Sequence, residues 1–143
     1  RVRVQRGEPG GGLWPVAAVG GAAMALDLRT WDALGGFDER FTFYFEDIDL
    51  CRRARSAGHE VAVVREARVE HRGGGTRSHH APEAAWHLGR SHVLFARGLG
   101  GGTLRKAGRL VWVGALGCGW TVRSVGPSAV PRFARGWWAG LSA

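Results

Sequence analysis

Cysteine is scarce in this chain of 143 residues. Only Cys51 and Cys118 are present, and neither has a partner at a spacing typical of a disulfide framework, so we expect a reducing compartment. The opening stretch RVRVQRGEPGGG has no apolar core and does not resemble a secretory signal. The longest uncharged apolar run, residues 110–122, is shorter than the roughly 20 residues that a bilayer-spanning helix needs. These absences predict a cytoplasmic protein without a transmembrane anchor.

Negative charge is missing from the second part of the chain. Residues 84–143 contain eight Lys or Arg and no Asp or Glu, whereas residues 1–83 balance twelve of each sign. The net charge of +8 therefore lies in the C-terminal part, and it predicts an anionic partner: phosphate groups, an acidic lipid surface or nucleic acid. No recognised nucleic-acid motif accompanies the charge, so nucleic acid is the least favoured of the three.

A phosphate-binding loop near the start is also absent. A doubly wound α/β fold opens with a βα unit that carries such a loop, so the pattern here predicts only the latter part of an α/β sandwich. The apolar periodicity first predicts a strand buried on both faces at 16–27, a short helix at 28–36 ended by Gly35, and an aromatic loop at 37–45. A helix at 46–57 ended by Gly58 and a strand at 59–64 are expected next. An amphipathic helix is predicted at 83–97, with two further helical pieces beyond the glycine-rich stretch at 98–102.

One long stretch carries a family pattern. GGFDERFTFYFEDIDLCRRARSAGHEVAVVREARVEH combines a GGFDE turn, an aromatic run, an ED-x-DLC-x-R helix, a Gly turn, a strand, and a His before a Gly-rich loop. This pattern, from about Trp14 to Gly75, resembles glycosyltransferase family 2 and especially its rhamnosyltransferase-like members. The resemblance implies an α/β fold: residues 1–82 would be the C-terminal, acceptor-side half of an incomplete GT-A (nucleotide-diphospho-sugar transferase) sandwich, followed by a helical, basic tail at 83–143.

The resemblance also implies an activity. Such enzymes move a sugar, here with rhamnose as one candidate, from a nucleotide-diphosphate donor to a glycan or lipid-linked saccharide with inversion, in cell-wall or polysaccharide synthesis. In the family, an upstream half carries an Asp-x-Asp motif that holds a divalent cation, Mg²⁺ or Mn²⁺, against the donor diphosphate. Here the recognisable residues begin in the acceptor half. The resemblance therefore implies that this chain alone is an inactive fragment, with the other metal ligands in an absent N-terminal half.

Asp47-Ile48-Asp49 spells Asp-x-Asp, but we do not expect it to bind the cation. Positions i and i+2 of a helix face different ways, so the two carboxylates cannot easily share one ion. Asp49 is expected instead to pair with Arg52 or Arg53, three and four residues later.

By the resemblance, Asp47 is the general base and His71 belongs to the metal or diphosphate site. The residues themselves leave simpler roles open: Asp47 can be a helix cap, and His71 a structural histidine. Asp47 would lie in the first turn of its helix, where the dipole favours the ionised carboxylate. Tyr44 and Phe45 are expected to exclude water and stack on a sugar, with Glu46 orienting the substrate.

Three arginines complete the predicted site. Arg72 and Arg77 flank the Gly-rich loop and would face phosphate oxygens. Arg90 would reach a phosphate of the donor or of a lipid carrier, and its alternative is an ordinary exposed helical arginine.

The basic tail at 83–143 supports a second hypothesis about the function. Its tryptophans interleave with arginines, which is typical of a helix that lies in the interface at the inner face of the cytoplasmic membrane. The same residues could equally well pack against the missing half of the enzyme. The alternative function is therefore a non-enzymatic, basic membrane-surface or anion-binding module, in which the acidic cluster only starts a helix.

Overall fold

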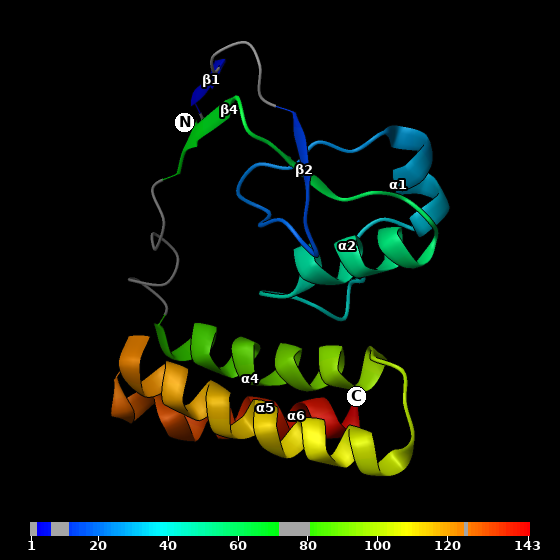
Figure 1. Ribbon diagram of the computed structural model, residues 1–143. Helices are drawn as coiled ribbons and strands as arrows, with labels where there is room; N and C mark the ends of the chain where they lie inside the picture. Colours follow the sequence, from blue (N-terminus) through cyan, green and yellow to red (C-terminus); the bar gives the residue numbers. More distant parts are fainter. Residues whose placement is uncertain (1–2, 7–11, 72–80, 125) are drawn as a thin grey trace. The chain divides into compact units, whose positions relative to one another are not determined.

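The computed structural model describes residues 3–6, 12–71, 81–124 and 126–143, which fall into two compact units (Figure 1). The first unit comprises Arg1–Asp38 and Glu46–Gly73, and the second comprises Glu39–Phe45 and Gly74–Ala143. The aromatic loop thus belongs by its contacts to the second unit, although it interrupts the first in sequence. The boundary between residues 82 and 83 followed the family pattern and stays a prediction.

The strands of the first unit are short. β1 (Arg3–Arg6) pairs with β4 (Ala67–Glu70), and β2 (Leu13–Pro15) pairs with β3 (Ala62–Val64), both antiparallel. The second ladder is extended by one bond of 2.9 Å from the Val16 N–H to the Val61 carbonyl. The strand predicted at 59–64 is therefore confirmed over its last three residues.

The prediction of a buried strand at residues 16–27 is wrong. Beyond Val16 this segment forms a turn and irregular backbone, and most of its residues are exposed. A strand buried on both faces needs neighbours for its N–H and C=O groups. Within the described residues β3 pairs with β2 instead, and the Gly21 N–H donates to the Asp47 carboxylate. The segment is apolar, but the pairing that makes a strand depends on residues distant in sequence.

The helix α1 (Leu28–Leu34) has the predicted place and end. The Asp27 carboxylate accepts the Thr30 N–H at 3.1 Å and caps the start, while Gly35 ends the helix with a left-handed φ of 72°. Trp31 is half-buried and packs edge-on against Phe37 with ring centroids 5.0 Å apart.

The helix α2 (Glu46–Ser56) lies within one residue of its prediction. Leu50, Cys51 and Ala54 form its buried stripe, and Gly58 follows with a φ of 88° that terminates the helix. The acidic residues occupy its first turn and arginines its last, as the helix dipole favours.

The second unit is helical. α4 (Ala81–Gly98), α5 (Thr103–Ser124), a short 3₁₀ turn (Pro127–Ala129) and α6 (Val130–Ser142) confirm the predicted helices and lie side by side in Figure 1. Leu88 and Phe133 lie in the core, and Trp137 packs against it. Gly89 and Gly136 let α4 and α6 approach backbone to backbone, because a Cβ at either position would overlap main-chain atoms of the other helix.

Candidate functional site

Asp47 is held in a defined orientation at the start of α2. Its Oδ2 accepts the Gly21 N–H at 2.6 Å, and its Oδ1 accepts the Ile48 N–H at 2.7 Å. One oxygen thus accepts from a backbone donor of the first helical turn, although Asp47 lies inside α2 and not at its N-cap, while the other anchors the Gly20-Gly21 loop. The carboxylate is half-buried, and no ion pair with it occurs among the residues that the structure describes. An oriented, unpaired carboxylate is what a general base requires.

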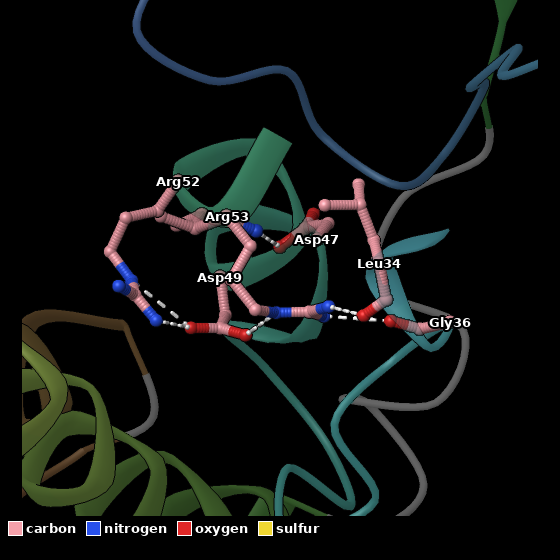
Figure 2. A network of polar contacts seen from close by, with 7 residues as sticks. Leu34, Gly36, Asp47, Asp49, Arg52 and Arg53 are labelled. Atoms are coloured by element: carbon pink, nitrogen blue, oxygen red, sulfur yellow. Dashed lines mark hydrogen bonds and ion pairs between the residues drawn. The ribbon is translucent and has the colours of Figure 1, made fainter. Parts of the chain in front are cut away.

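Asp49 has a different environment, as Figure 2 shows. Its side chain is buried and forms ion pairs of 2.7 Å with both Arg52 and Arg53. Arg53 in turn donates to the carbonyl oxygens of Leu34 (2.6 Å) and Gly36 (2.7 Å), which end α1. The predicted pairing of Asp49 is therefore confirmed, and this carboxylate joins α2 to the end of α1.

The two carboxylates make separate contacts: Asp47 accepts from backbone N–H groups, and Asp49 pairs with two arginines. Across the described part of the chain, no group of three or more His, Cys, Asp or Glu side chains is placed to hold a metal. His71 follows β4 and is exposed. Its role as a metal ligand stays a prediction, and Arg72 and Arg77 lie outside the described residues.

Tyr44 and Phe45 adopt an uncommon backbone conformation in the second unit. Their φ values are 68° and 72°, in the left-handed region that costs a residue with a side chain roughly 1–2 kcal/mol. The Phe45 ring packs against His92 and Phe95, with centroids 4.6 and 5.2 Å away. Ser91 Oγ donates to the Phe43 carbonyl at 2.9 Å and fixes the loop to α4. Strain of this kind is concentrated at functional sites.

Glu46 directly follows these aromatic residues in the chain. Its Oε2 is buried, and among the described residues no donor reaches it. A buried carboxylate oxygen without a partner is costly, which is consistent with a group that bonds to a substrate. Its substrate-binding role stays a prediction.

Arg90 lies on α4, in the same unit as Tyr44 and Phe45. Its Nη1 donates to the Arg40 carbonyl, so part of the guanidinium holds the aromatic loop. Its expected contact with a phosphate stays a prediction.

His92 was missed by the sequence reasoning. Burial lowers its pKa, and its ring lies between Phe45 and Phe133, with centroids 4.6 and 6.0 Å away. The sequence spacing does indicate its burial. His92 is four residues after Leu88 and three before Phe95, so helical spacing puts it on the apolar face of α4. Burial, followed by the charge of Arg90, also lowers the pKa of His87.

Comparison with known proteins places the sequence around this site in a known family. Residues 10–91 match the model of a family described as Glycosyltransferase like family 2. Uncharacterized proteins of Mycobacterium bovis and Mycobacterium tuberculosis are 36% identical over 87 residues, which are 59% of this chain and 33% of those proteins. An N-acetylglucosaminyl-diphospho-decaprenol L-rhamnosyltransferase of Mycobacterium tuberculosis is 37% identical over 57 residues, which are 40% of this chain and 19% of that protein. The chain thus spans a third or less of the length of these relatives. No solved structure matches it significantly.

Proposed function

The chain belongs to the glycosyltransferase-like family 2, and from this premise we propose that it forms the acceptor side of an inverting sugar transferase of GT-A type. The donor is a nucleotide-diphosphate sugar, and the acceptor is a glycan or a lipid-linked saccharide. One relative is named for an acceptor carried on decaprenol diphosphate and for rhamnose. We extend that chemistry to this chain: a polyprenol-diphosphate saccharide as acceptor and rhamnose as the first donor sugar to test, in cell-wall or polysaccharide synthesis.

Asp47 is the general base of this proposal. The acceptor hydroxyl oxygen attacks the anomeric carbon, the bond from that carbon to the donor diphosphate breaks, and the hydroxyl proton passes to the Asp47 carboxylate. The observation that carries this assignment is the contrast between two neighbours on α2. Asp49 is buried and paired with two arginines, whereas Asp47 is held by backbone N–H groups and keeps an accessible carboxylate.

The leaving diphosphate needs positive charge around it. We propose that His71, Arg72 and Arg77 contribute to that side of the site, and that a divalent cation, Mg²⁺ or Mn²⁺, supplies the rest when it is bound. Imidazole is a suitable donor for such borderline cations. The remaining cation ligands would come from residues outside this sequence.

An open apolar groove in the first unit supports the GT-A part of the proposal. The groove has a volume of about 820 Å³ and is lined by Leu50 and Cys51 of α2, by Val61, and by Met24 and Leu26 of the irregular segment. We propose that the remaining strands of the sandwich pack into this groove and bring the donor site with them. Residues 16–27 would then gain the strand partners that they lack among the described residues.

The test is the substitution Asp47→Asn in the native-length enzyme. With a nucleotide-diphosphate sugar and a polyprenol-diphosphate saccharide, we expect kcat to fall by about 10²–10⁴-fold while donor binding is kept, because Asn has the same shape but cannot take a proton. Asp32→Asn is the matched control, since Asp32 is exposed on α1. A kcat for Asp47→Asn equal to that of the control would refute the assignment.

A further inference from the structure

The helix α5 is apolar on the side that faces away from its own unit. Its inner side contains the buried residues Gly117 and Thr121, and a Cβ on Gly117 would overlap the Phe133 ring of α6. Its outer side carries large apolar side chains that are exposed: Leu104 (87%), Val111 (73%), Trp112 (65%), Leu116 and Val122. The outer side of a helix packed on one face is ordinarily polar.

These exposed residues form one continuous stripe, which we call the α5 outer face. At 100° per residue, all five positions fall on one side of the helix, and the exposed small residues Gly108, Ala115 and Gly119 lie on the same side. Residues 110–122 carry no charge, so about 20 Å of helix is uncharged all round. A contiguous exposed apolar stripe of this kind marks an interaction surface.

The charges around the stripe indicate the kind of partner. Arg105 and Lys106 lie at one end of α5, and Arg123 lies at the other. In the same unit, α6 carries the exposed residues Arg132, Arg135 and Trp138. Because residues 84–143 contain no carboxylate side chain, a second copy of this face would meet it with like charge. An apolar stripe with tryptophan and a cationic border fits the headgroup region of an anionic lipid bilayer.

We propose that the α5 outer face docks the protein on an anionic membrane surface, with the helix axis parallel to the bilayer plane. None of the helices in the described ranges is both long and apolar enough to cross a bilayer. Binding parallel to the surface buries Val111, Trp112 and Leu116 among the acyl chains, while the flanking arginines contact lipid phosphates. The proposal goes beyond the sugar-transfer chemistry, because the surface contains none of the residues assigned to that reaction.

The first experiment is flotation of the 143-residue chain with vesicles. We expect the chain to float with vesicles that mix phosphatidylglycerol with phosphatidylcholine, and to bind pure phosphatidylcholine less well. High salt should weaken the binding, since it screens the arginine–phosphate attraction.

The double substitution Trp112→Glu with Leu116→Glu should lower the affinity by about tenfold or more, because it puts two carboxylates against the anionic surface. Leu28→Glu is the matched control: Leu28 is an exposed leucine of α1, and its substitution should leave binding unchanged.

A second readout locates the contact. Brominated acyl chains quench nearby tryptophan fluorescence, and Trp112→Phe should remove most of that quenching. Equal vesicle binding by the double variant and the control would overturn the proposal, as would failure of the parent chain to bind either vesicle. Loss of folding in the double variant would also overturn it, since it would show that the face is buried against protein.

Discussion

Two aspartates separated by one residue have different environments in α2. Asp49 is buried and joins its helix to the end of α1 through Arg53, while Asp47 orients the Gly20-Gly21 loop and remains accessible. The helical repeat makes this division possible, because residues i and i+2 face different sides. The pairing of Asp49 was predictable, since its partners are three and four residues away. The bond between Asp47 and Gly21 was not, because it joins positions 26 residues apart.

Asp49→Asn should destabilise the first unit. The substitution removes the negative charge that two arginines contact, and we expect the free energy of unfolding to fall by about 2–3 kcal/mol. Urea unfolding followed by circular dichroism measures the loss. Asp32→Asn changes an exposed aspartate and should alter stability by less than about 0.5 kcal/mol. Equal effects of the two substitutions would show that the ion pairs contribute nothing.

His92 should make the second unit sensitive to acid. Burial lowers its pKa in the folded state below the unfolded value of 6.5, so the unfolded chain takes up the proton first as pH falls. The stability contribution of neutral His92 is therefore complete above about pH 7 and decreases as the pH falls through 6.5 toward its lowered pKa. His92→Phe should reduce this pH dependence in urea unfolding, and a smaller remainder is expected from His87, whose pKa burial also lowers. A pH dependence unchanged by His92→Phe would contradict this explanation.

At the scale of elements, the helices were predictable because their signals are local. Asp27 and Gly35 bound α1, and Gly58 follows α2, each within a few residues of the helix that it delimits. The segment 16–27 was not predictable from its composition, since a strand depends on partners distant in sequence. The left-handed conformation of Tyr44 and Phe45 was also unpredictable. Aromatic residues disfavour it, and the bond from Ser91 to Phe43 that holds this loop spans 48 residues.

The contact between α4 and α6 should depend on glycine. A Cβ on Gly136 would overlap the Trp86 carbonyl group, so Gly136→Ala should separate the helices and cost about 2–3 kcal/mol of stability. Gly108→Ala is the matched control, because Gly108 has open space around it in α5 and alanine favours a helix by about 0.5–1 kcal/mol. Thermal unfolding should therefore shift in opposite directions for the two variants. A shift of the same sign in both would contradict the close packing.

At the scale of the whole molecule, the two units differ in how they are held together. The second unit has a continuous core along α4 and α6, whereas the first exposes Trp14 and has an open groove lined by exposed apolar residues such as Leu26 and Val63. The sequence indicated the charge asymmetry and the family. It could not indicate that residues 39–45 join the helices, because that grouping depends on contacts between distant segments.

Amide hydrogen exchange should show this difference. In the 143-residue chain we expect the slowest exchange in α4 and α6, and exchange at least about tenfold faster in residues 17–26, whose backbone forms no ladder in the described structure. Mass spectrometry of proteolytic peptides resolves these segments. Slow exchange in 17–26 would mean that this segment is paired, contrary to the structure.

The central claim is that Asp47 accepts the proton of the acceptor hydroxyl. The most direct measurement is the pH dependence of kcat/KM for sugar transfer by the native-length enzyme and its Asp47→Asn variant. If the claim is right, the parent enzyme loses rate toward acid with unit slope as one carboxylate is protonated, and the variant is slow with no such acidic limb. A variant that keeps both the rate and the acidic limb would show that another group is the base.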